Sequence, residues 1–177
     1  MHIFKVPARE EVSEDNQHLF DNFKKMMGFV PNLLAMFAHS DTALADVLAL
    51  SNRTSTLTKK EKEAINLIVS QVNGCKYCLA GHTVVARYAG FTDDEILQIR
   101  KAEVQFDKKL DVLVQFVKET TIQRGKPSTD VLNRFFEAGY TDGNLVDAII
   151  AIAGKIITNY LHNITQIPVD WPAVPEI

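Results

Sequence analysis

The chain has 177 residues, 46% of them hydrophobic and 23% charged, with a formal net charge of −3. This mixture is ordinary for a globular protein that buries a core, and its weakly acidic balance gives no reason to expect nucleic acid or an anionic membrane as a partner. Two cysteines in a chain of this length exclude a disulfide-stapled scaffold and point to redox or metal chemistry instead.

The N-terminal residues give no signal-peptide pattern, because Met1–Lys5 is followed by charged residues instead of an apolar stretch. No apolar run approaches the roughly 18 residues of a membrane span. We therefore expect a cytoplasmic protein without a membrane segment.

Hydrophobic periodicity predicts helices in the first part of the chain. After an extended lead-in, the apolar stripe of residues 13–27 predicts a helix that Gly28 ends. A short helix is expected to begin at Pro31, which suits the first turn of a helix, and another at residue 41 or 42. Together these elements form a predicted N-terminal helical extension, residues 1–55.

The middle of the chain, residues 56–165, is predicted to be the helical core that holds the redox motif. Thr58 and Glu61 form a capping-box pattern, and an amphipathic stripe runs behind it to about Val72. Further helices are expected, in chain order, over residues 75–89, 92–100, 107–124, 127–139 and 141–164.

The last twelve residues, 166–177, hold three prolines and are expected to form an extended tail with Trp171 as its anchor. No segment shows a convincing strand pattern. We therefore predict a single all-α, bundle-type domain over residues 1–177, with no sheet.

Both cysteines lie between Gly74 and His82, directly after an Asn-Gly turn signal. On a helix, Cys75 and Cys78 are one turn apart and His82 is one turn beyond Cys78, so the three side chains project from one side. Unpaired N–H groups and the positive dipole end of a helix N-terminus stabilise a thiolate, and Lys76 is expected to add positive potential. Two such thiols can attack an oxidant and then close a disulfide.

Peroxide reduction by a thiol also requires proton transfer, because the thiol must lose a proton and the leaving alkoxide must gain one. His82, four residues after Cys78, can relay this proton. A carboxylate is the usual partner of such a histidine. We choose Glu63, because it lies at the edge of the apolar face of the preceding helix and can reach a site between the two helices.

The pattern Glu63-x11-Cys75-x2-Cys78-x3-His82 resembles the active-site signature of the AhpD-like alkylhydroperoxidases, within the carboxymuconolactone decarboxylase superfamily. The resemblance implies an AhpD-like helical fold and a peroxiredoxin-type alkyl hydroperoxide reductase or disulfide reductase. It implies that Cys78 attacks the peroxide and that Cys75 resolves it and is regenerated by a dithiol partner. It also implies that Glu63 and His82 form the proton relay.

The long N-terminal portion fits the peroxidase-related members of this superfamily better than the minimal decarboxylases. Some members carry a further histidine just before the second cysteine, where this chain has Tyr77, whose hydroxyl could serve instead. The resemblance also implies a homo-oligomer and an external dithiol reductant, such as a lipoyl group, a thioredoxin-like protein or a small thiol. No cofactor and no metal are expected.

Other interpretations fit parts of the pattern. The two cysteines could be buried structural thiols, or they could bind zinc with His82 and Glu63, although three ligands on one helix are unusual for zinc. Decarboxylation of a muconolactone acid is the superfamily's other activity, but members with that activity lack the paired cysteines. A non-catalytic oligomer whose thiols only sense oxidant is a further alternative.

Overall fold

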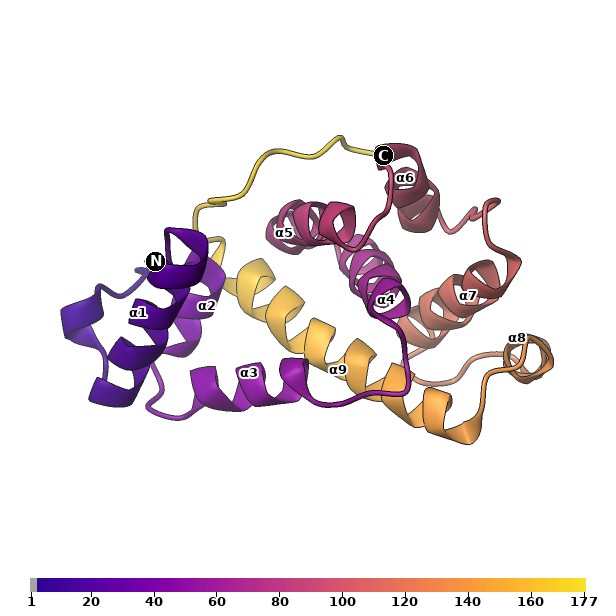
Figure 1. Ribbon diagram of the computed structural model, residues 1–177, viewed down its shortest axis with the longest axis horizontal. Coiled ribbons are helices and arrows are strands. Elements are labelled where there is room, and N and C mark those ends of the chain that lie inside the picture. The colour runs from indigo at the N-terminus through magenta and orange to yellow at the C-terminus, as the bar shows by residue number, and fades with distance from the viewer. Residues whose placement is uncertain (1–2) are drawn as a thin grey trace. The chain divides into compact units, whose positions relative to one another are not determined.

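The computed structural model describes residues 3–177, and within that range every regular element is a helix (Figure 1). The prediction of an all-α fold is confirmed. The chain forms two compact units. Unit 1 comprises the chain up to Arg53 together with Leu161–Asp170, and unit 2 comprises Thr54–Tyr160 together with Trp171–Ile177. The prediction of one domain stays a prediction.

Unit 1 contains three α-helices, which lie within a residue or two of the predicted bounds. Its elements are η1 (Arg9–Glu11), α1 (Glu14–Met27), α2 (Asn32–Phe37) and α3 (Ala43–Asn52). Gly28 ends α1 at φ 84°, a left-handed conformation that favours glycine, and its N–H donates to the Lys24 carbonyl at 2.9 Å. The aromatic side chains Phe20, Phe23 and Phe37 belong to the unit's core, in which Leu44 is fully buried.

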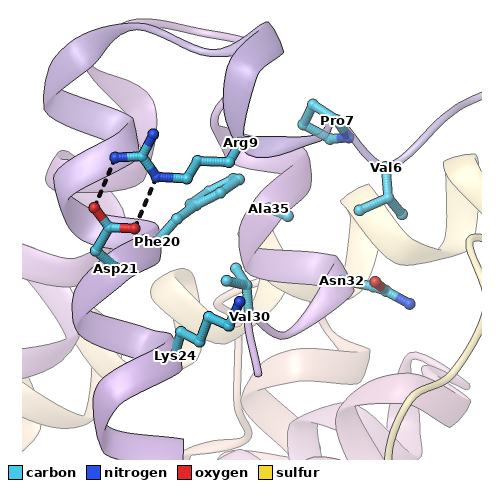
Figure 2. Close-up of a pocket in the computed structure, with 9 residues that line it drawn as sticks. All are labelled: Val6, Pro7, Arg9, Phe20, Asp21, Lys24, Val30, Asn32 and Ala35. Carbon is cyan, nitrogen blue, oxygen red and sulfur yellow. Dashed lines mark hydrogen bonds and ion pairs between the residues drawn. The ribbon is translucent and has the colours of Figure 1, made fainter. Parts of the chain in front are cut away.

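An open hollow on unit 1 has none of the predicted redox residues in its lining (Figure 2). Its lining mixes apolar side chains with Arg9, Asp21 and Lys24. The Arg9 guanidinium is bound to both carboxylate oxygens of Asp21, at 2.8 and 2.7 Å. Because the Arg9 guanidinium is already paired with the Asp21 carboxylate, and both side chains are about half-exposed, Arg9 is not available to bind an anionic ligand in the hollow.

Unit 2 contains the helices that carry the predicted motif. They are α4 (Lys59–Val72), α5 (Lys76–Tyr88), α6 (Asp93–Lys101), α7 (Lys108–Ile122), α8 (Thr129–Glu137) and most of α9 (Asp142–Thr165). The predicted capping box is present at the start of α4, where Thr58 and Glu61 exchange hydrogen bonds. The buried face of α4 packs against α5 and α7 through Ile65, Ile68 and Val69, which are at most 1% exposed.

The long helix α9 is the one helix within residues 3–177 that could cross a membrane by length and composition. Its best 18-residue window has a mean hydropathy of 1.3, and 39% of that window is buried. In the sequence, Asp147 and Lys155 interrupt the apolar run of this helix. In the structure both polar residues are buried, and Ala148 and Ile152 join the core of unit 2. A helix that packs into a protein core can have the same length and hydropathy, so these two properties do not assign a membrane role to α9.

The final residues, Trp171–Ile177, contact α5 and α6. The Trp171 indole lies beside Gly81, so close that a Cβ added to Gly81 would be 3.3 Å from two of its ring atoms. The Arg100 side chain donates to the Pro175 carbonyl at 2.8 Å, and Lys76 pairs with Glu176 at 2.8 Å. The tail is thus tied to unit 2 by one ring and two polar contacts.

Candidate active site

A tight turn between α4 and α5 positions the cysteines. Gly74 adopts φ 64° and its N–H donates to the Gln71 carbonyl at 3.2 Å. The N–H of Cys75 donates to the Ser70 carbonyl at 3.0 Å. These bonds satisfy the end of α4 and turn the chain so that α5 runs back along it.

The same turn is held from α9 by buried polar side chains. The Asn73 side chain donates to Asn159 Oδ1 at 3.0 Å, and Asn159 in turn donates to Ser70 Oγ at 3.2 Å. Asn159 and Ser70 are fully buried. Because buried amides are costly unless they are hydrogen-bonded, this chain of bonds fixes the register of α9 against the start of the cysteine helix.

Cys75 and Cys78 form a disulfide, with their Cα atoms 5.3 Å apart. The helix begins at Lys76, one residue later than the predicted start at Cys75, because Cys75 is the N-cap and its Sγ accepts the N–H of Cys78 at 3.2 Å. The two cysteines are only 0% and 3% exposed. The spacing is within the ordinary disulfide range, so the pair can close without backbone movement.

Glu63 and His82 meet between α4 and α5. His82 Nδ1 lies 2.7 Å from Glu63 Oε2, and the Asn66 side chain donates to the other carboxylate oxygen at 3.0 Å. The side chains of Glu63 and His82 are 14% and 21% exposed. The structure therefore brings together the two residues that the sequence predicted to pair, and His82 lies on the helix that also carries Cys78.

A fifth residue, Lys155, lies beside His82, and the sequence did not predict it as a site residue. Its Nζ is hydrogen-bonded to His82 Nε2, and the residue is 9% exposed. The contact spans 73 residues of sequence, which no local pattern reveals. One signal was available: Lys155 is the only lysine or arginine of α9, and apolar residues surround it.

These three groups shift one another's pKa values. Burial alone raises the pKa of Glu63, but the charge and hydrogen bond of His82 and the charge of Lys155 outweigh it, so the net pKa is lowered. Burial and then the Lys155 charge lower the pKa of His82, against the opposing effect of Glu63. Burial lowers the pKa of Lys155 to about 8 although Glu63 opposes it. At neutral pH the group is therefore a carboxylate, a neutral imidazole and an ammonium.

Lys76 does not supply the positive potential that was expected of it. Its ammonium pairs with Glu176 and its side chain is 78% exposed, so water screens its charge from the cysteines. Lys155 is the cation that reaches His82. Tyr77, between the cysteines, is buried at 4% exposure.

The zinc interpretation gains no geometric support. In the part of the chain that the structure describes, no three or more His, Cys, Asp or Glu side chains are arranged to hold a metal ion. The two sulfur atoms are bonded to each other.

The sequence model of the carboxymuconolactone decarboxylase family matches residues 32–107. This segment contains all four residues of the predicted motif. The resemblance to this superfamily, expected from the motif, is confirmed. A search of curated protein sequences found no match.

Solved structures share the fold over nearly the whole chain. A peroxidase-related protein from Silicibacter sp. TM1040 has a TM-score of 0.83 at 22% identity, covering 93% of this chain and 90% of that one. An AhpD-core, peroxidase-related protein from Ralstonia eutropha JMP134 has a TM-score of 0.85 at 20% identity, covering 94% and 91%. A variant of the debrominase Bmp8, in complex with 2,3,4-tribromopyrrole, has a TM-score of 0.78 at 12% identity, covering 96% and 93%. At these identities the likeness establishes the fold.

Proposed function

Because residues 32–107 match the carboxymuconolactone decarboxylase family and the fold is that of the AhpD-like proteins, we propose that the chain is a thiol-dependent peroxidase. It reduces a hydroperoxide through a dithiol–disulfide cycle of Cys78 and Cys75, with Glu63 and His82 as proton relay. The observation that supports this most is a closed disulfide on the helix whose His82 is bonded to a carboxylate. Two of the structural neighbours carry peroxidase-related descriptions, which agree with it.

The first step is attack of the Cys78 thiolate on the terminal oxygen of the hydroperoxide. An S–O bond forms and the O–O bond breaks, so Cys78 is oxidised to sulfenic acid and the peroxide is reduced to an alkoxide. The alkoxide takes one proton from the relay and leaves as the alcohol. His82 is one helical turn from Cys78, which puts their Cβ atoms roughly 5–6 Å apart.

The second step closes the disulfide. Cys75 attacks the sulfenic sulfur, an S–S bond forms, the S–O bond breaks, and the oxygen leaves as water with the Cys75 proton and the proton already on it. Cys75 suits this role because its Sγ accepts a helix-start N–H, which stabilises a thiolate.

An external dithiol then reopens the disulfide by exchange and is itself oxidised. A lipoyl group, a thioredoxin-like protein or a small thiol is the proposed reductant, and a homo-oligomer in the cytoplasm the proposed state. These assignments are tested by reconstitution of turnover with each dithiol and by light scattering of the purified chain.

Substitution of the cysteines tests the proposal. Cys78→Ser should abolish peroxide-dependent oxidation of an added dithiol, because it removes the attacking sulfur. Cys75→Ser should still consume one equivalent of peroxide and leave a sulfenic acid on Cys78 that a dimedone probe traps, without turnover. Stopped-flow peroxide loss and intact-protein mass spectrometry measure both. Full turnover by Cys78→Ser would contradict the assignment.

The two remaining readings predict different results in the same assay. A thiol sensor would consume one equivalent of peroxide in the wild type and show no turnover with any dithiol. A decarboxylase of the kind that names the family would release carbon dioxide from a muconolactone acid as fast in Cys78→Ser as in the wild type. Sustained dithiol-dependent turnover separates the proposed peroxidase from both.

A further inference from the structure

Lys155 is a buried cation that lies beside His82 and Glu63, the two residues of the proposed proton relay. It is 9% exposed and is the only lysine or arginine of α9. A buried ammonium is costly unless it is paired and hydrogen-bonded. The hydrogen-bond partner of its Nζ is Nε2 of His82, and the nearby opposite charge is Glu63. The fold therefore places this charge in the site and not at the surface, where an unpaired lysine would cost little.

The contacts of His82 define its tautomer. An ionised Glu63 can only accept, so the proton between them is carried by His82 Nδ1. In the neutral ring Nε2 then has a free lone pair, and Lys155 donates an N–H to it. The result is a line of carboxylate, imidazole and ammonium, whose charges sum to zero.

Resting on the proposed function, we propose that Lys155 is a positioning residue of the redox site that holds His82 in the Nδ1-protonated tautomer and stores the proton that the leaving alkoxide takes. Nε2 is the ring atom left to exchange a proton, and through it the Lys155 proton reaches the alkoxide. The exchangeable proton of the resting dithiol form then resides on Lys155 and not on the imidazole.

The proton balance of the cycle closes with this assignment. The resting site holds the Cys78 thiolate, the Cys75 thiol and the Lys155 ammonium. Peroxide reduction consumes the Lys155 proton, which protonates the alkoxide by way of His82, and the reaction yields a disulfide, an alcohol and water. In the disulfide form Lys155, whose pKa is about 8, takes a proton back from solvent at pH 7. Reduction of the disulfide by the external dithiol restores two thiols, and Cys78 then releases its proton to solvent.

The charged and titratable side chains that face Lys155 are consistent with this role. They are Glu63 from α4 and His82 from α5. Burial brings the pKa of Lys155 to about 8, close enough to neutral for an amine to exchange a proton during turnover.

Nitrogen NMR of the His82 ring tests the inference without any peroxide. In the oxidised wild type at pH 7 we expect Nδ1 to be protonated and Nε2 bare. In Lys155→Met the proton affinity of His82 should rise about tenfold or more, because a nearby cation is removed while Glu63 stays. Lys155→Arg, which keeps the cation, should leave the titration near that of the wild type. Lys101→Met removes an exposed lysine of α6 and is the matched control.

A second measurement follows the thiol. On a Cys75→Ser background, alkylation of Cys78 by iodoacetamide at pH 7 should be about tenfold slower with Lys155→Met, since the site loses the cation that favours the thiolate. The two rates should converge above about pH 10, where the thiol ionises without help.

An unchanged His82 titration in a folded Lys155→Met protein would overturn the inference and leave Lys155 a packing residue. If that variant does not fold, the NMR spectrum of the wild type tests the inference by itself. A His82 ring protonated at Nε2 in the oxidised wild type would also contradict the inference. If the wild type turns over peroxide but the His82 titration is unchanged in Lys155→Met, only this inference is contradicted. If the titration shifts but the wild type shows no turnover, only the proposed function is contradicted.

Discussion

Glu63 keeps its negative charge through its neighbours and not through water. His82, Lys155 and Asn66 together lower its pKa below the ordinary value although burial acts in the opposite direction. A carboxylate whose pKa is lower in the folded state adds stability above its unfolded pKa, and this stability is lost as the pH falls through the folded pKa. Glu63 therefore makes the fold sensitive to acid.

Glu63→Gln should weaken the pH dependence of the unfolding free energy in acid. In urea titrations from pH 6 to pH 3, the unfolding free energy of the wild type should fall more steeply than that of the variant below the ordinary glutamate pKa. The same variant should form the Cys78 thiolate more slowly, because His82 loses the negative charge that favours its protonation. Glu137→Gln, at an exposed position of α8, is the control. Parallel pH profiles for the wild type and Glu63→Gln would show that the pair does not stabilise the fold.

The sequence could predict the Glu63–His82 pair but not Lys155, and the reason is distance along the chain. Glu63 and His82 lie on consecutive helices joined by a short turn, so helical periodicity and the turn signal together place them face to face. Lys155 reaches the same ring from α9, and its position depends on how helices distant in sequence pack.

At the scale of elements, the helices of unit 2 follow from their end signals. Thr58 with Glu61 forms the capping box that the sequence predicted, and Thr92 with Glu95 forms a second one at the start of α6. The start of α5 was misplaced by one residue because a sulfur atom of Cys75 serves as the cap. Cysteine is not among the usual N-cap residues, so no sequence rule identifies it.

Gly81 lets the tail lie against α5, and its substitution reports on the tail. Gly81→Ala would place a Cβ 3.3 Å from two atoms of the Trp171 ring, so the ring must shift by a few tenths of an ångström. Trp171 is the only tryptophan. Its fluorescence emission should therefore change in this variant, while the extra methyl favours the helix by up to about 1 kcal/mol.

Gly143→Ala is the matched control for that experiment. It adds the same methyl at the start of α9, where the nearest atoms are at ordinary contact distances and belong to Thr141 and Thr56. Its emission spectrum should equal that of the wild type. Identical spectra for Gly81→Ala and the wild type would mean that the indole does not rest on α5 in solution.

At the scale of the whole molecule, both redox states must be folded if the cysteines are to cycle. The disulfide closes a loop of only four residues, so its loss should cost at most about 2 kcal/mol in the chain-entropy model, against about 4.7 kcal/mol for a 100-residue loop. Reduction with excess dithiothreitol should leave the far-ultraviolet circular dichroism unchanged and lower the unfolding free energy by no more than that amount. Loss of helix on reduction would make the disulfide structural and end the catalytic assignment.

The division of the chain shows the same limit of sequence reasoning at larger scale. The first boundary between the two compact units lies between Arg53 and Thr54, just before the capping box of α4. The return of Leu161–Asp170 to unit 1 was not predicted. A helix that continues without a break gives no sign in its own sequence that its last turn serves another core.

The burial of both cysteines limits the shape of the reductant. A sulfur that is almost fully covered cannot be approached by the broad, flat surface on which a folded donor carries its own dithiol, unless the covering side chains open. A slender arm, such as a lipoyl group on its lysine tether, needs only a narrow entrance. Among the proposed reductants, we therefore expect a lipoyl arm to reduce the disulfide faster than a folded dithiol protein.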